Sequence, residues 1–207
     1  MSDVIVAHGV EVELGGTPVL REVGLVVTAG EVLAVVGENG AGKSTLLRCV
    51  AGLQPTRRGE IDVFGRPPAD APSFWKQVVM AGDEPAWYPG LSVREHLELA
   101  SIVHEGSRMT VDQALEEFEL DGRADLSPLS LSTGQRQRLS LAVALLRPSR
   151  LLLLDEPERG LDAGGRAKLT GILKDYAAGG GTVVMATHDL ELANATGARL
   201  ITLEPAS

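Results

Sequence analysis

The chain has 207 residues, of which 44% are hydrophobic and only 3% aromatic, enough for one large domain with an aliphatic core. Its formal net charge of −9 argues against broad binding to nucleic acid, which depends on lysine and arginine side chains neutralising phosphates. The sequence shows no signal-peptide pattern and no apolar run near the roughly 18 residues of a spanning helix, and its single cysteine, Cys49, excludes an internal disulfide, so we expect a reducing cytoplasm.

The first part of the chain is predicted to be a small antiparallel sheet. Apolar residues favour strands over residues 4–6, 10–14 and 19–27, and Gly15-Gly16 is a hairpin signal between two of them. A further strand is expected over residues 59–65, a proline-rich loop over 66–73 and a short strand over 78–81.

The segment Gly37-Glu38-Asn39-Gly40-Ala41-Gly42-Lys43-Ser44-Thr45 has the phosphate-binding pattern G-x-x-x-x-G-K-S. A buried strand is predicted before it, over Val32–Val36, and a helix after it, from Ser44 to Val50. Glycines let backbone N–H groups converge on phosphate oxygens, and the helix N-terminus adds its own N–H groups. Lys43 can supply a charge for the β- and γ-phosphates, and Ser44 can offer a hydroxyl to Mg²⁺.

The middle of the chain changes to a helical pattern, with two amphipathic helices expected between residues 92 and 119. The α/β pattern then returns, with helices near 133–146 and 163–177 and strands at 150–154, 182–186 and 199–203. We therefore predict a single α/β domain over residues 1–207, with a core of residues 1–82 and 128–207 and an inserted helical subdomain over 83–127.

Two carboxylates follow the apolar run of Leu151 to Leu154, which is typical of a strand buried on both faces. They would lie at the edge where open α/β sheets bind ligands. Asp155 can hold Mg²⁺, and Glu156 can polarise a water for attack on a γ-phosphate. His188 also follows a predicted strand and so is expected at the same edge, whereas His8, His96 and His104 are expected to be structural or surface residues.

A capped helix is predicted to begin in the segment Leu131-Ser132-Thr133-Gly134-Gln135, with Ser132 as its N-cap. By itself this pattern is typical of an ordinary helix. Its N-terminal N–H groups are nevertheless suited to binding an anion.

Together these motifs resemble those of the ATP-binding-cassette (ABC) ATPases over nearly the whole chain. The resemblance implies a P-loop NTPase fold with a RecA-like core, ATP and Mg²⁺ as ligands, Glu156 and His188 as catalytic residues and Asp162 as part of the D-loop. It implies magnesium contacts from Ser44, Asp155 and Asp83. It also implies nucleotide contacts from Leu14, Gly37, Asn39, Gly40, Gly42, Lys43, Ser44 and Thr45, and contacts to a partner's ATP from the signature residues Leu131, Ser132, Thr133, Gly134 and Gln135.

The chain departs from the family pattern at four places. Thr133 stands where the first signature glycine is usual, and Asp83 aligns with the Q-loop glutamine. Leu14 aligns with the aromatic residue that usually stacks on adenine, and Glu158-Arg159 replaces small or polar residues before the D-loop. Because Lys43 and the other key motif residues remain, we expect hydrolysis to be retained.

The resemblance also implies partners. Two such domains pair head to tail, so we expect a second cassette, either another copy of this chain or a close paralogue. A separate membrane permease is expected to dock near Trp87 and Tyr88, which places the chain in the cytoplasm on the inner face of the membrane, with no nucleic-acid partner. Residues 86–97 resemble the corresponding stretch of simple exporters, which favours export over import. The alternatives are a non-transport cassette acting in translation, DNA repair or chromosome maintenance, and a P-loop kinase or GTPase.

Overall fold

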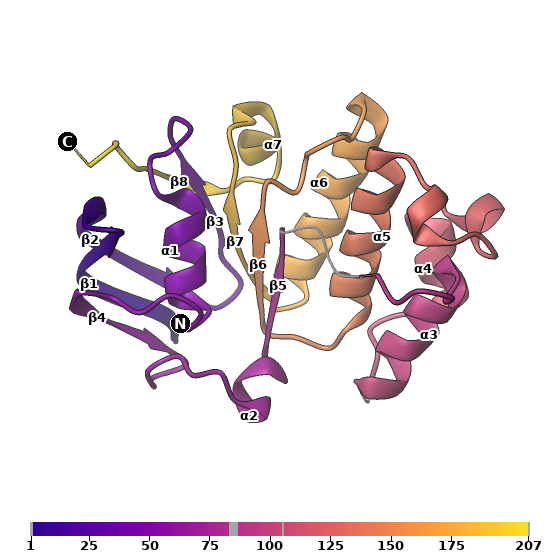
Figure 1. The fold of residues 1–207 in the computed structure, drawn as a ribbon, viewed down its shortest axis with the longest axis horizontal. Coiled ribbons are helices and arrows are strands. Elements are labelled where there is room, and N and C mark those ends of the chain that lie inside the picture. Colours follow the sequence, from indigo (N-terminus) through magenta and orange to yellow (C-terminus); the bar gives the residue numbers. More distant parts are fainter. Residues whose placement is uncertain (1, 83–86, 105, 207) are drawn as a thin grey trace.

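A five-stranded parallel sheet forms the centre of the computed structural model, which describes residues 2–82, 87–104 and 106–206 (Figure 1). The strand order is β5-β6-β7-β3-β8. The bounds of these strands confirm the strands predicted for this part of the fold. They are β3 (Val32–Val36), β5 (Val78–Ala81), β6 (Leu151–Asp155), β7 (Thr182–Ala186) and β8 (Arg199–Thr202).

Alternate residues of the central strands enter two different apolar cores, because side chains alternate across a sheet. Leu152 and Leu154 of β6 pack in the core that includes residues of α5 (Thr133–Leu146) and α6 (Ala163–Ala178). Leu151 and Leu153 pack on the other face with α1 (Lys43–Val50) and the small sheet. The run of four leucines is therefore buried on both sides, as its composition predicted.

The small sheet is antiparallel and has the order β2-β1-β4, with β1 (Asp3–Leu14), β2 (Thr17–Thr28) and β4 (Arg58–Val63). The predicted hairpin at Gly15-Gly16 is confirmed, with both glycines at positive φ. The predicted break between residues 6 and 10 is wrong. The strand continues through an irregular register around Gly9, whose φ is 56°. A glycine in a β-bulge therefore resembles, in the sequence, a glycine in a turn.

The two predicted amphipathic helices are present as α3 (Val93–Val103) and α4 (Val111–Glu117). Each begins with a capping box, from Ser92 and Glu95 in α3 and from Thr110 and Gln113 in α4. The buried apolar residues of both helices belong to the same apolar cluster as those of α5. Short 3₁₀ turns, Asp121–Arg123 and Pro128–Ser130, lead the chain back to α5.

Two short helices were not predicted. The helix α2 (Pro72–Trp75) replaces part of the expected loop, and α7 (Leu190–Ala195) follows His188. Both are too short to show a helical period, although Pro72 at the first turn of α2 and Asp189 as the cap of α7 are local start signals.

Two further observations concern the interior and the membrane. Cys49 is buried in the core, and this burial raises the pKa of its thiol to about 11. Among the helices of the described residues, none combines the length and apolar character needed to cross a bilayer.

Candidate active site

The phosphate-loop pattern forms a tight turn between β3 and α1 that only glycine can make. Gly42 caps α1 with a left-handed backbone, and a Cβ there would lie 2.6 Å from Leu20 Cδ2 and 2.8 Å from the Val19 carbonyl oxygen. A Cβ on Gly37 would lie 2.4 Å from the Leu203 carbonyl oxygen. The first N–H groups of α1 have no intrahelical partners, as in any helix, and no side chain caps them. The loop therefore presents the donors that a phosphate requires.

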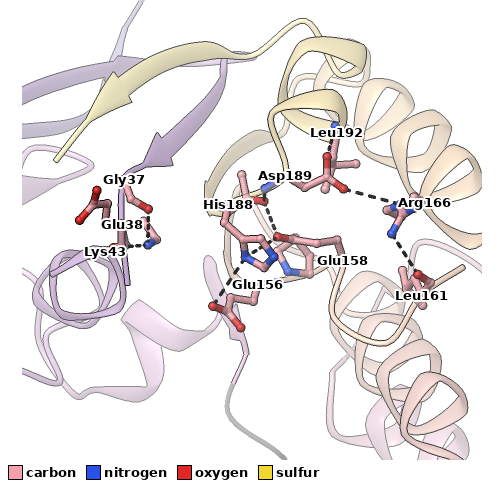
Figure 2. Close-up of polar contacts among 12 residues, drawn as sticks. Gly37, Glu38, Lys43, Glu156, Glu158, Leu161, Arg166, His188, Asp189 and Leu192 are labelled. Carbon is pink, nitrogen blue, oxygen red and sulfur yellow. Dashed lines mark hydrogen bonds and ion pairs between the residues drawn. The ribbon is translucent and has the colours of Figure 1, made fainter. Parts of the chain in front are cut away.

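Lys43 places its ammonium group inside this loop (Figure 2). The residue is only 7% exposed, and its Nζ donates hydrogen bonds to the carbonyl oxygens of Gly37 at 2.8 Å and Glu38 at 2.9 Å. An ammonium has three donors, so one remains for a phosphate oxygen. Asn39 and Gly40 lie in the same turn, with Gly40 at a φ of 86°, and Ser44 and Thr45 form the first turn of α1.

The pairing of three strands brings the phosphate loop, the acidic pair and His188 to one edge of the sheet. Ala186 of β7 is paired with Val35 on one side and with Asp155 on the other. The phosphate loop begins two residues beyond Val35, and His188 lies two residues beyond Ala186. The three motifs therefore follow neighbouring strand ends, which is the expected place for a ligand of a parallel sheet.

Glu156 has an unusual backbone that points its side chain off the end of β6. Its φ is 47°, a left-handed conformation that costs roughly 1–3 kcal/mol in a residue other than glycine. Its N–H donates a hydrogen bond to the carbonyl oxygen of Ala186 at 2.9 Å, which holds this conformation in place. Beside it, the chain after β5 approaches so closely that a Cβ on Gly82 would lie 2.3 Å from Asp155 Cβ.

The structure brings the two predicted catalytic residues together. The Nδ1 atom of His188 lies 3.9 Å from Glu156 Oε1 and 3.5 Å from Glu158 Oε1 (Figure 2). The His188 and Glu156 side chains are 61% and 37% exposed, so both are accessible to a ligand. In the sequence Glu158 is only a departure from the family pattern, and its place beside His188 comes from the fold.

The signature segment forms the N-terminus of α5 and carries the predicted cap. Ser132 Oγ accepts a hydrogen bond from Gln135 N–H at 3.3 Å, and Gln135 Oε1 accepts one from Ser132 N–H at 3.0 Å. This box leaves the first-turn N–H groups of Thr133 and Gly134 for an outside acceptor. Leu131, at the start of the segment, is buried in the core.

The start of α5 is packed against the chain that follows Glu156. A Cβ on Gly134 would lie 2.3 Å from the Gly160 carbonyl oxygen, so glycine is required there for close approach. Gln137 Nε2 donates to the Pro157 carbonyl oxygen at 3.1 Å. Asp162 caps α6 by accepting the Gly165 N–H at 2.8 Å. The signature segment and the predicted D-loop are thus one connected surface.

Leu14, a predicted nucleotide contact, lies at the end of β1 and is 45% exposed to solvent. Asp83 lies outside the described residues, so its expected role in magnesium binding stays a prediction.

Comparison with known proteins identifies the family. The protein-family model described as "ABC transporter" matches residues 20–159 of the chain. The chain belongs to this family. It is 36% identical over 179 residues to the SkfA peptide export ATP-binding protein SkfE of Bacillus subtilis (strain 168), covering 84% of this chain and 74% of the relative. It is 39% identical over 190 residues to the aliphatic sulfonates import ATP-binding protein SsuB 2 of Agrobacterium fabrum (strain C58 / ATCC 33970), covering 91% and 71%.

Solved structures agree with the fold prediction. The dimeric, post-hydrolysis structure of the ATP-binding cassette MJ0796 with ADP and Pi superposes with a TM-score of 0.84 at 27% identity, covering 97% of this chain and 94% of that one. The fold is therefore that of a P-loop NTPase cassette, and the chain is an ABC ATP-binding subunit that hydrolyses ATP. The residues fit Mg²⁺·ATP, because the glycine loop and Lys43 offer donors to phosphates and the hydroxyl of Ser44 and carboxylate of Asp155 are hard oxygen ligands.

The exposed Leu14 leads to a prediction about adenine. We expect Leu14→Tyr to tighten ATP binding by roughly tenfold, because base–aromatic stacking contributes about 1–3 kcal/mol. Titration calorimetry with ATP tests this, with Leu53→Tyr as a control, since Leu53 is similarly exposed at 44% on another part of the surface. Equal ATP affinities for wild type and Leu14→Tyr would show that position 14 does not contact the base.

Proposed function

We propose that this ABC ATPase drives a separate membrane permease, and that the permease is an exporter. The proposed mechanism of ATP hydrolysis rests on one observation. The phosphate loop, the pair Asp155 and Glu156, and His188 come together at one edge of the parallel sheet. In this proposal Lys43 and the loop N–H groups hold the phosphates. Asp155 and Ser44 hold Mg²⁺, which when bound would neutralise phosphate charge.

Glu156 is the proposed general base for the attacking water. The backbone of Glu156 is hydrogen-bonded to Ala186, which fixes the position from which the carboxylate extends at the strand edge. His188 lies within 4 Å of this carboxylate and is the residue proposed to contact the γ-phosphate. Catalysis of phosphoryl transfer consists mainly of positioning and charge stabilisation, and this arrangement supplies both.

The proposed cassette partner is a second copy of this chain, arranged head to tail. In this proposal the chain supplies both halves of such a site. One half is the phosphate loop with Asp155 and Glu156 at the sheet edge, and the other is the capped signature segment, which leaves the N–H groups of Thr133 and Gly134 for an outside acceptor. A triphosphate between two copies would receive donors from both. The Thr133 methyl and hydroxyl groups would lie near that phosphate, where a smaller glycine is usual.

The permease is proposed to dock in a groove of about 350 Å³ between α1, β5 and α5. Its walls include both tryptophans, Trp75 and Trp87, together with Val79, Met80 and Val143. The indole Nε1 of Trp87 is buried and has no hydrogen-bond partner among the described residues, so a docked segment with a free carbonyl would satisfy it. Aromatic residues with a polar end are suited to such interfaces.

His96 holds the segment that contains Trp87 and Tyr88 against α3. Its Nε2 accepts the Tyr88 N–H at 3.0 Å, its Nδ1 lies 2.7 Å from the Ser92 carbonyl oxygen, and its ring meets Trp87 edge to face at a centroid distance of 5.4 Å. Tyr88 remains 60% exposed beside the groove. His96 is thus a structural residue, as predicted, and it orients the proposed docking surface.

The direction of transport is proposed from the sequence around this surface. Relatives named for export and for import are about equally similar to the chain, at 36% and 39% identity. We favour export because residues 86–97 resemble the corresponding stretch of simple exporters. Docking on a permease would place the chain on the cytoplasmic, inner face of the membrane. No observation favours the non-transport alternatives.

Loss of the Trp87 indole is expected to release the chain from native membranes. Affinity purification from detergent-solubilised membranes should recover a multi-spanning protein with wild type and with the control Ile102→Ala, whose side chain is exposed on α3 outside the groove. Trp87→Ala should lose most of it, provided that its melting temperature shows a folded chain. Recovery of wild type only with ribosomes or DNA-binding proteins would overturn the transport proposal.

A further inference from the structure

The carboxylate of Glu158 is buried next to the proposed catalytic pair, Glu156 and His188. Glu158 lies two residues beyond Glu156 in a turn and is only 5% exposed. Burying a carboxylate costs free energy unless hydrogen bonds compensate it. Its position therefore requires a local explanation.

The contacts of Glu158 lead to His188. The buried hydroxyl of Thr187 donates to Glu158 Oε1 at 2.5 Å and accepts the Asp189 N–H at 2.9 Å. The same Oε1 lies 3.5 Å from Nδ1 of His188 (Figure 2). Glu158 Oε2 is buried and has no hydrogen-bond partner among the described residues. Thr187 thus fixes the carboxylate, and the imidazole is the group that the carboxylate faces.

We propose that Glu158 is a positioning residue that holds the Nδ1–H of His188 and so directs the Nε2 atom toward the nucleotide. This inference rests on the catalytic role proposed above for His188. A hydrogen bond at one ring nitrogen sets both the tautomer and the orientation of the ring. His188 needs such a restraint because its side chain is 61% exposed.

The surroundings favour this assignment over a purely structural one. Hydrogen-bonding Thr187 needs only one carboxylate oxygen, and a neutral side chain could do it without a buried charge. Glu156 also faces Nδ1 but is farther away, at 3.9 Å, and its carboxylate is needed for water. With Glu158 holding the imidazole, Glu156 is left to act as base.

Nuclear magnetic resonance of ¹⁵N-labelled imidazoles reports the tautomer directly. At a pH well above the ordinary imidazole pKa of about 6.5, we expect the proton of wild-type His188 to be on Nδ1. Glu158→Ala should move it toward Nε2, whereas Glu158→Gln should keep it on Nδ1, since the amide oxygen can accept the same hydrogen bond. Glu156→Gln and the exposed control Glu191→Ala should leave it on Nδ1. An unchanged tautomer in Glu158→Ala would overturn the proposal.

Turnover in a double-mutant cycle tests whether Glu158 acts through His188. Glu158→Ala is expected to slow ATP hydrolysis about tenfold or more, as loss of a supporting group commonly does, and Glu158→Gln to restore most of it. In the His188→Ala background, Glu158→Ala should have no further effect, and multiplying effects would contradict the proposal. If His188→Ala alone hydrolyses ATP at the wild-type rate, the catalytic role of His188 is wrong, and the tautomer measurement alone decides the Glu158 contact.

Discussion

Glu156→Gln is expected to slow ATP hydrolysis by roughly 10²–10⁴-fold, the usual contribution of a general base, while ATP affinity stays close to wild type. Glutamine has nearly the same shape and keeps the backbone N–H bond to Ala186, but it cannot accept a proton from water. Steady-state phosphate release measures the rate, and calorimetry with ATP measures the affinity.

The matched control is Glu191→Gln, which removes an exposed acid in the first turn of α7, three residues beyond His188. It should hydrolyse ATP at the wild-type rate. Robust turnover by Glu156→Gln would show that this carboxylate is not the base, and Asp155 and Glu158 would then be the remaining acids to test.

Lys43→Ala is expected to weaken ATP binding itself by roughly 10–100-fold, because a hydrogen bond to a charged group contributes about 1.5–3 kcal/mol. The structure adds a reason, since the Lys43 ammonium is already inside the loop and bonded to Gly37 and Glu38. Binding of a fluorescent ATP analogue measures the change.

The control for this variant is Lys174→Ala, which removes an exposed lysine of α6 and the same unit of charge. It should bind ATP like wild type. Since the Lys43 bonds also hold the loop, a melting curve of Lys43→Ala must show a folded chain. Unchanged ATP affinity in the folded variant would count against the phosphate-loop assignment.

The sequence predicted the parallel sheet and its motifs well because their signals are local. The leucines of β6 need burial on both faces, and Gly37, Gly42 and Lys43 have a spacing that only a strand–loop–helix unit satisfies. Strand pairing then places Asp155 and His188 beside that loop.

Other features could not be predicted because they depend on distant contacts or on very short elements. The helices α2 and α7 have too few residues for a period, and the bulge at Gly9 looks like a turn until β2 and β4 pair on either side of β1. The contact between Glu158 and His188 joins residues thirty positions apart, so no spacing rule reveals it. The division into a core and a subdomain over residues 83–127 stays a prediction.

The most direct test of the central proposal, an ATP site completed by a second copy of this chain, is the solution mass of Glu156→Gln by light scattering with and without Mg²⁺·ATP. We expect the 21.8 kDa chain to be monomeric without nucleotide and to double its mass with ATP, and we expect Ser132→Arg, at the signature segment, to abolish that doubling. A Glu156→Gln chain that binds ATP at saturation yet stays monomeric would contradict the proposed head-to-tail site.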